Sequence, residues 1–410
     1  MKFIIFGQFS FSHVYFLCYA CFTLIPEILR DELYGNNNKI SQYFYNMYLS
    51  ILSRILSLIP YFINKKLTKS KKEELKEKKK NISAFDINFI YTDQKIDYSK
   101  NLMKSILKVA IFEFLAESLI CIFYFINDKP DVIIVYPLQI YLIINTITQY
   151  LVSHFVLNYM FYKHHYLSFG INIFCTIIFL LIDILEIIYK NISDYQYYIY
   201  VFMRIFKLFL FACEDNYAKH VLYKEFLTPF SLMVYMAIIE SILLLIFSIP
   251  FIFIKTSDTN KIIFVDFGEY LKGTNILLSL GILISNFLFE TFVLVIIDRF
   301  SPSHLPLGFI IYSIFSGIYS IIRYKINNRK LEFYRYSNFF LYIILFIGAM
   351  IHNEIFIINK WGFNNNTKLF LELKLNEEKR LENDEEDDVY DIRYKSIDTV
   401  IPLKDMDNSH

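Results

Sequence analysis

Charged side chains interrupt an otherwise apolar stretch of the chain between Tyr197 and Val221. On a helix that turns about 100° per residue, they fall within an arc of roughly 140° and would form one polar face. Because an ionisable side chain at the centre of a membrane helix costs about 2.5–3.5 kcal/mol, such residues are candidates for a substrate pathway. The five residues are Arg204, Lys207, Glu214, Asp215 and Lys219.

This polar face has two interpretations. Lys207 and Glu214 are nearest the middle of the stretch, so we expect them to face a cavity, where Lys207 and Arg204 could bind an anionic group such as phosphate. Alternatively, Arg204 extends to the headgroups, while Asp215 and Lys219, four residues apart, neutralise each other. Both interpretations stay open for Arg204 and Lys219.

Carboxylates also stand inside other apolar stretches. Glu113 and Glu117 are four residues apart, so they share one helix face and repel each other in a low dielectric. The pair predicts either proton coupling or an ion pair with a cation such as Arg54. A second stretch carries Asn286 and Glu290 with the same spacing, and Glu240 stands alone in its own stretch. The predicted substrate-binding residues are Lys207, Glu214, Arg204, Glu117, Glu290, Asn286, Glu113 and Glu240.

The central charges do not fix the sign of a substrate. Six acids (Glu113, Glu117, Glu214, Asp215, Glu240, Glu290) face four bases (Arg54, Arg204, Lys207, Lys219). A carrier of nucleotide sugars or related organic anions needs uncompensated positive charge. An exporter of amines or organic cations needs uncompensated carboxylate.

Motifs of catalysis are missing from the sequence. There is no glycine-rich phosphate loop, no histidine-rich metal spacing and no G-x-S-x-G turn, so we predict no catalytic residues, no metal, no cofactor and no enzyme activity. Cys18 and Cys21 form a C-x-x-C inside an apolar run, where small packing residues are the simpler interpretation. The charged tails favour a further alternative, a membrane scaffold or receptor that transports nothing.

Apolar runs of about 20 residues, the length that crosses a bilayer core, must position these side chains. Apolar residues make up 55% of the 410 residues, charged residues only 20%, and the mean hydropathy is +0.39. We therefore predict an all-α polytopic membrane protein with about ten transmembrane helices. The predicted spans are Ser12–Ile28, Tyr43–Ile63, Ile106–Ile126, Ile133–Leu157, Leu167–Ile188, Tyr197–Val221, Phe230–Ile254, Ile276–Ile297, Leu307–Ile322 and Phe339–Ile358.

The basic residues predict the orientation. Twelve lysines stand from Lys65 to Lys104, between the second and third spans, and loops rich in lysine and arginine face the cytosol. With an even number of spans, both termini would also be cytosolic. One loop disagrees, because five basic residues between Arg323 and Arg335 would lie on the opposite side.

Short matches between the halves of the chain predict an internal repeat. Ile-Pro60 matches Ile-Pro250 at a shift of 190, Glu117 matches Glu290 at a shift of 173, and Pro137-Leu138 matches Pro306-Leu307 at a shift of 169. The matches join spans two, three and four to spans seven, eight and nine. Since each half holds five helices, an odd number, the two repeats would be inverted in the membrane.

Ten spans in two halves, a short basic turn (Tyr162-Lys163-His164-His165) before the fifth span, and a tenth span ending Gly348-Ala-Met-Ile-His-Asn-Glu354 resemble the drug/metabolite transporter superfamily. The pattern is most similar to its EamA-like and nucleotide-sugar-transporter-like members and covers about residues 1–360. The resemblance implies two inverted five-helix halves and alternating access.

The expected organisation follows from these patterns. Residues 1–190 form the first half, with a cytosolic basic loop at 65–104; residues 191–360 form the second half; and residues 361–410 form a disordered cytosolic tail. The expected partners are a small-molecule solute and the lipid bilayer, with a homodimer as a further candidate assembly and no nucleic acid. The expected location is an endomembrane, such as the Golgi or the endoplasmic reticulum, or the plasma membrane.

Overall fold

The computed structural model describes residues 4–6, 13–34, 39–66, 100–126, 140–157, 161–189, 195–224, 227–253, 264, 267–326, 333–367 and 369–375. Helices dominate these residues, and ten of them contain 17 to 30 residues each. They are α1 (Val14–Tyr34), α2 (Lys39–Ile55), α5 (Lys100–Ile126), α7 (Ile140–Leu157), α8 (Lys163–Tyr189), α9 (Tyr195–Lys224), α10 (Pro229–Phe253), α12 (Asn275–Arg299), α13 (Leu305–Ile326) and α14 (Phe333–His352). The short elements are α11 (Phe267–Tyr270), η3 (Pro302–His304), β1 (Ile4–Phe6) and β2 (Phe356–Ile358).

Some of these helices could each cross a membrane. Five helical segments are long and apolar enough to cross a membrane by length and composition: Ser41–Lys66, Lys163–Ile182, Pro229–Phe253, Asn275–Arg299 and Pro302–Arg323. Their outer faces carry large apolar side chains, such as Phe253, which is 80% exposed. These helices make the chain a multi-pass membrane protein, and the predicted helical fold class is confirmed at this level.

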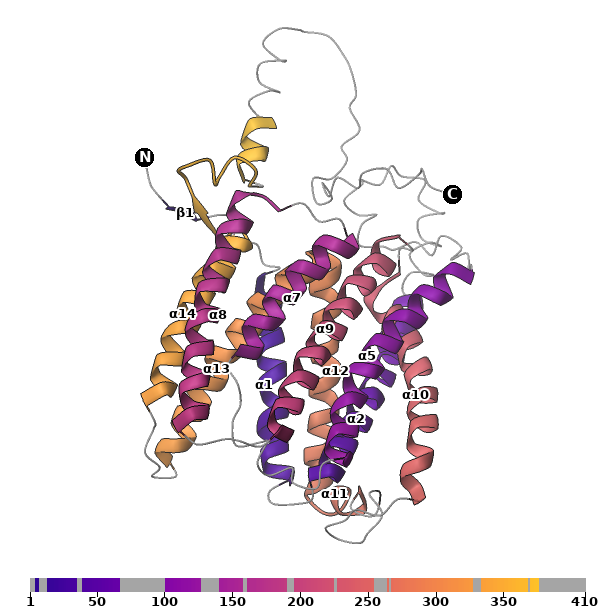
Figure 1. Cartoon of the computed structure of the whole chain (residues 1–410). Helices are drawn as coiled ribbons and strands as arrows, with labels where there is room; N and C mark the ends of the chain where they lie inside the picture. The colour runs from indigo at the N-terminus through magenta and orange to yellow at the C-terminus, as the bar shows by residue number, and fades with distance from the viewer. Residues whose placement is uncertain are drawn as a thin grey trace, which may run out of the picture.

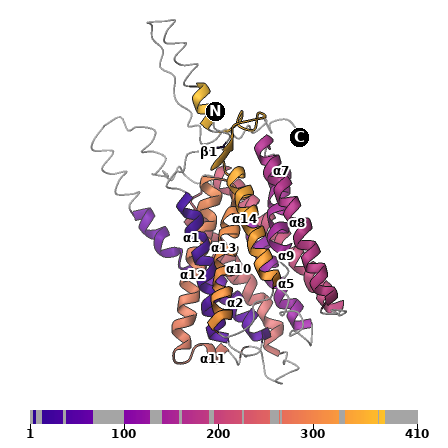
Figure 2. The same ribbon diagram turned by 90° about the vertical axis from the view of Figure 1, so that its left-hand side faces the viewer.

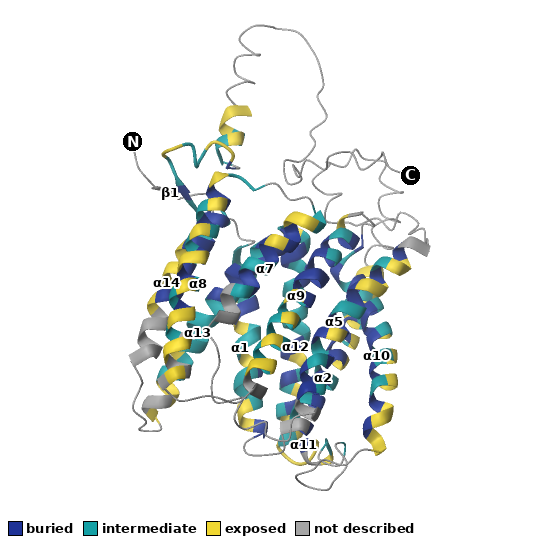
Figure 3. Cartoon of the chain, viewed as in Figure 1, coloured by how far each residue is buried: buried dark blue, intermediate teal, exposed yellow. Residues whose placement is uncertain are grey.

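The long helices lie side by side in one bundle (Figure 1). In the middle of the bundle, α1 packs against α12 and α13, while α9 packs against α5 and α7. The helices α2 and α10 pack on each other, and α8 and α14 form a pair at one edge, which Figure 2 shows from the side. Buried residues face the interior of the bundle and exposed apolar residues face outward (Figure 3).

A glycine leaves room for an aromatic side chain where α13 meets α1. A methyl group added to Gly308 of α13 would lie 2.6 Å from Cδ1 of Tyr19 on α1. The Tyr19 side chain is buried between the rings of Phe289 and Phe309, whose centroids are 5.1 and 5.4 Å from its own. Small residues are common at helix interfaces in membranes, and Gly308 leaves the space that the Tyr19 ring fills between α1 and α13.

The tenth span ends earlier than predicted, and a strand follows it. The helix α14 stops at His352, and β2 pairs antiparallel with β1, with Ile4 opposite Ile358 and Phe6 opposite Phe356. Glu354 adopts φ +56°, and Ile355 N–H donates to the Met350 carbonyl at 2.9 Å, which closes the helix end. The predicted helix up to Ile358 is therefore wrong for its last residues.

Order also extends into the segment predicted to be a disordered tail. Residues 361–367 form turns, and residues 369–375 are helical. The helical stretch is rich in leucine with Glu372 and Lys374, all strong helix formers. The prediction of disorder is wrong for this part, and residues 376–410 lie outside the described residues.

Candidate functional site

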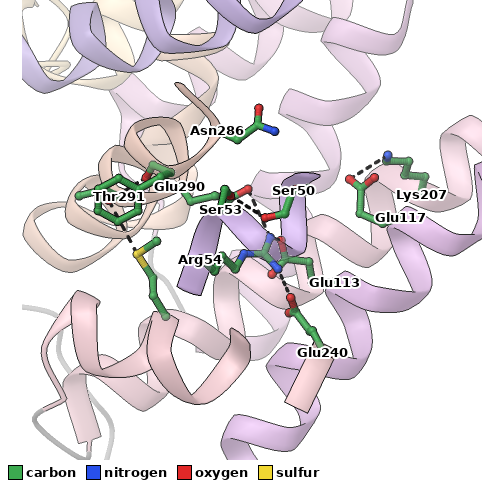
Figure 4. A network of polar contacts seen from close by, with 12 residues as sticks. Ser50, Ser53, Arg54, Glu113, Glu117, Lys207, Glu240, Asn286, Glu290 and Thr291 are labelled. Carbon is green, nitrogen blue, oxygen red and sulfur yellow. Dashed lines mark hydrogen bonds and ion pairs between the residues drawn. The ribbon is translucent and has the colours of Figure 1, made fainter. Parts of the chain in front are cut away.

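Arg54 of α2 lies at the centre of a buried ion cluster. Its Nη1 donates to Glu240 of α10, its Nη2 pairs with Glu113 of α5, and the same Nη2 is 3.3 Å from Oε1 of Glu290 on α12. Figure 4 shows the three carboxylates around the guanidinium. We call these four residues the Arg54 cluster. It joins four helices that are distant in the sequence.

The Arg54 cluster is short of positive charge. The guanidinium is a planar fork with five N–H donors and can serve several carboxylates at once, which an ammonium on a flexible stem does less well. One positive charge nevertheless faces three carboxylates. Among the described residues, Oε2 of Glu113 and Oε1 of Glu240 have no hydrogen-bond partner. Arg54 is only 2% exposed, so water does little to compensate the excess.

Two further polar contacts flank the cluster. Lys207 of α9 donates to Oε1 of Glu117 on α5 at 3.1 Å, and its Nζ lies 5.0 Å from the centre of the Phe211 ring. Arg30 of α1 donates to Oδ1 of Asn286 on α12, also at 3.1 Å. Each basic residue thus bridges the first helix of one predicted half to the third helix of the other.

Glu214 and Asp215 form a pair of acids on α9, about two helical turns after Lys207. We call them the α9 acidic pair. Gln149 of α7 donates its side-chain N–H to Asp215, and Asn216 donates to Oε1 of Gln149 at 3.4 Å. All four side chains are buried. The pair is close enough to Glu290 for their charges to interact, so it belongs to the same polar interior as the Arg54 cluster.

The structure brings together seven of the eight predicted site residues. The Arg54 cluster and its flanking contacts include Glu113, Glu117, Lys207, Glu240, Asn286 and Glu290, and Glu214 lies within electrostatic reach of Arg54. Glu240, expected to stand alone, is an Arg54 partner. Arg204 is different: its guanidinium carbon lies 5.8 Å from the ring centre of Tyr200, one turn away on α9.

The alternative in which Asp215 and Lys219 neutralise each other is wrong. Lys219 donates from Nζ to the Asp298 carbonyl at 2.9 Å, and Asp215 accepts from Gln149. The neutralisation of Asp215 by Lys219 fails because α7 and the end of α12 each offer a partner across the helix interface.

Sequence reasoning missed Arg30 and Gln149. Arg30 follows the predicted end of the first span at Ile28, whereas α1 continues to Tyr34 and carries Arg30 into the bundle. Gln149 is uncharged and, unlike Asn286, is not part of a sequence match between the halves. A search for every polar side chain in the apolar stretches, amides included, would have found it.

Histidines gather at the end of the bundle that carries the strands. Tyr162 N–H donates to Nδ1 of His165, and Nε2 of His165 lies 3.1 Å from Nε2 of His164, which is 3.4 Å from Glu354. Since Nδ1 of His165 accepts, its Nε2 carries the proton in the neutral ring and donates to His164. Nε2 of His164 thus accepts and has no proton to donate to Glu354, so the hydrogen bonds run from Tyr162 to His165 and end at His164. No group of three or more His, Cys, Asp or Glu among the described residues could hold a metal ion.

A comparison with protein-family models found none that matches this chain, and a comparison with curated proteins found no match either. The function must therefore be argued from the geometry of the buried charges and from the arrangement of the helices.

Proposed function

We propose that this protein is a membrane transporter that moves a small polar solute by alternating access between two inverted halves. The halves comprise residues 1–190 and 191–360, with five helices each. The single observation that carries the proposal is the Arg54 cluster, in which one guanidinium and three carboxylates meet inside the bundle where α2, α5, α10 and α12 come together. Ionisable groups inside membrane proteins usually mark a pathway for ions or substrates.

The helix packing supports two equivalent halves. If each helix of the first half is exchanged with the fifth helix after it, α1 corresponds to α9, α2 to α10, α5 to α12, α7 to α13 and α8 to α14. The contact of α1 with α12 then becomes that of α9 with α5, and the contact of α1 with α13 becomes that of α9 with α7. The pairs α2–α10 and α8–α14 map onto themselves. The sequence matches predict three of these five pairs, α2 with α10, α5 with α12 and α7 with α13.

Polar contacts obey the same exchange. Lys207 on α9 reaches Glu117 on α5, and Arg30 on α1 reaches Asn286 on α12. Both contacts join a first helix to a third helix and surround the place where the halves meet. In an alternating-access carrier this interface holds the substrate while the halves rock around it.

The charge balance favours a cationic solute. Six carboxylates lie in the polar interior, in the Arg54 cluster, at Glu117 and in the α9 acidic pair, against four bases, Arg30, Arg54, Lys207 and Lys219. An excess of buried carboxylate attracts amines and organic cations and repels phosphate. The geometry therefore supports an exporter of amines or organic cations better than a nucleotide-sugar carrier.

Counterflow measures the proposed activity directly. We expect purified protein in sealed vesicles to exchange labelled amines with saturable kinetics, and nucleotide sugars, nucleotides and organic acids to exchange less. Glu290→Gln keeps the shape of the side chain but removes a charge, and we expect it to reduce amine counterflow at least about tenfold. Glu32→Gln, at an exposed position on α1, is the matched control. Uptake equal to that of empty vesicles for all four classes would favour a scaffold or receptor.

Orientation is a second part of the proposal. We propose that the N-terminus and the C-terminus of the chain are both cytosolic, in an endomembrane or the plasma membrane. The strand β1 precedes α1 and the strand β2 follows α14, so their pairing brings the start and the finish of the helical part of the chain to the same side of the bundle. At the opposite end Arg323 pairs with Asp31, so one basic residue of the loop that disagreed with this orientation is neutralised by α1.

Glycosylation tests the orientation. Asn365 is exposed next to β2, so the proposal predicts that it is cytosolic and carries no sugar. The sequons at Asn81 and Asn191 lie outside the described residues; we predict that Asn81 is unmodified and that Asn191 faces the lumen or exterior. A glycosidase mobility shift on each Asn→Gln variant is the measurement. Sugar at Asn81 or Asn365 would reverse the orientation.

A further inference from the structure

Four histidine rings pack against one another at the end of the bundle that carries the strands. The ring centre of His165 lies 4.0 Å from that of His164 and 4.6 Å from that of His352. The rings of His352 and His304 are 5.5 Å apart, centre to centre. We call these four residues the histidine array. It joins the start of α8, which carries His164 and His165, to η3 and to the end of α14.

The hydrogen bonds of the histidine array fit uncharged rings. The backbone N–H of Tyr162 donates to Nδ1 of His165 at 3.0 Å, so this nitrogen holds no proton. Nε2 of His165 donates to Nε2 of His164 at 3.1 Å, so the second nitrogen holds none either. A proton added to either acceptor breaks the bond that the nitrogen accepts, because a protonated histidine has two N–H donors and no acceptor.

His352 is a poor place for a charge. Its side chain is 1% exposed, and neither of its ring nitrogens has a hydrogen-bond partner among the described residues. The ring lies nearly parallel to that of Tyr150 on α7, at 19° and with the centres 4.5 Å apart, and this contact supplies no acceptor atom. Burying a charge without a partner is costly, so the surroundings of His352 favour the neutral imidazole.

The charged groups around the array include few that could compensate added protons. Oε1 of Glu354 lies 3.4 Å from Nε2 of His164 and could pair with that ring once it is charged. Lys219 of α9 and His13 are close enough to His304 for their charges to interact, and both are bases. The other titratable groups at this end of the packed elements are His154, Lys163, His220, Asp298, Arg299 and Lys360. The acid of this set, Asp298, interacts with Lys219 and Arg299.

We propose that the histidine array is a pH-sensitive contact, which holds α8 against η3 and α14 while its rings are neutral and releases them when the rings are protonated. A proton on Nε2 of His164 redirects this atom to Glu354, so His165 loses its acceptor. Further protons place like charges on rings that touch one another, and like charges at this range repel. Since α8 belongs to the first proposed half and η3 and α14 to the second, acid would open the bundle between the halves at this end.

Thermal unfolding of the full chain in detergent tests the array at about pH 7.5 and about pH 5.5, on either side of the ordinary histidine pKa of about 6.5. The array is neutral in the fold but becomes charged in the unfolded chain at the lower pH. The unfolded state then binds more protons, so stability falls as the pH is lowered. We expect the wild-type unfolding temperature to fall by several degrees between the two conditions.

His352→Phe keeps an aromatic ring that cannot be protonated, so the fall in unfolding temperature should shrink by about half. His154→Phe, at an exposed position of α7, is the matched control and should show the wild-type fall. A fall in His352→Phe as large as that of the wild type would overturn the proposal. A wild-type unfolding temperature that is the same in both conditions would also overturn it.

Glu354→Gln provides a second variant if His352→Phe reduces folding. It removes the carboxylate that can compensate a charged His164, so the unfolding temperature should change little at the higher pH and fall further than that of the wild type at the lower pH. A fall no larger than that of the wild type would contradict the proposal. Because this measurement needs no solute, its failure would leave the transport proposal standing, and an absence of counterflow would leave the array unaffected.

Discussion

Replacing Arg54 with glutamine is expected to remove most of the folded protein. The substitution leaves Glu113, Glu240 and Glu290 facing one another in the bundle interior with no cation among them. Removing one partner of a buried ion pair typically costs about 3–5 kcal/mol, because the remaining charge stays buried without compensation. The measurement is the folded yield by size-exclusion chromatography, together with the unfolding temperature of the material that remains.

Three further variants separate charge from packing at this position. Arg54→Lys keeps the charge but loses the fork, so we expect an intermediate yield. The double variant Arg54→Gln with Glu240→Gln removes one charge of each sign and should recover part of the loss. Lys272→Gln, at an exposed position near α11, is the control. A normal yield for Arg54→Gln would mean that the cluster contributes little to the fold.

The second large effect is expected at Gly308. In Gly308→Ala the new methyl group meets the Tyr19 ring at 2.6 Å, and the rings of Phe289 and Phe309 restrict the movement of Tyr19. Overpacking of this kind typically costs about 1–3 kcal/mol, so the unfolding temperature should fall by several degrees. The variant should also separate α1 from α13 and weaken amine counterflow.

Gly170→Ala is the matched control, since nothing lies within 4 Å of the added methyl group on α8. Alanine is the better helix former, and this control should therefore be neutral or slightly stabilising. Adding Tyr19→Leu to Gly308→Ala should restore part of the stability. Equal losses at Gly308 and Gly170 would show that the tight approach of α1 and α13 is not the cause.

The helices of this fold were predictable because their signal is local. A run of about 20 apolar residues identifies a span wherever it occurs, and each of the ten predicted spans overlaps a long helix. The end of α14 was not predictable in this way. The stretch from Ile351 to Ile358 stays mostly apolar, and Glu354 ends the helix at positive φ, where glycine is usual. The pairing of β1 with β2 gives no local signal at all.

The site was predictable as a set of residues but only partly as a set of contacts. Buried charges stand out in apolar stretches, so the carboxylates were found individually, and Arg54 was correctly weighed as a partner of the third span. Spacing along one helix proved a poor guide to pairing for Asp215 and Lys219. Their partners come from other helices, and which helices meet is decided by packing across the whole bundle.

The small sheet has a consequence for the order in which the protein is made. The strand β2 is made about 350 residues after its partner β1. Protein synthesis adds roughly 5–20 residues per second, so the backbone of Ile4 to Phe6 lacks its strand partner for tens of seconds. Pairing then joins the first and last parts of the bundle after the intervening helices are synthesised. The sheet therefore forms last and fixes the start of the bundle to its end. A bulky fusion placed directly before Ile4 should slow this pairing of β1 with β2.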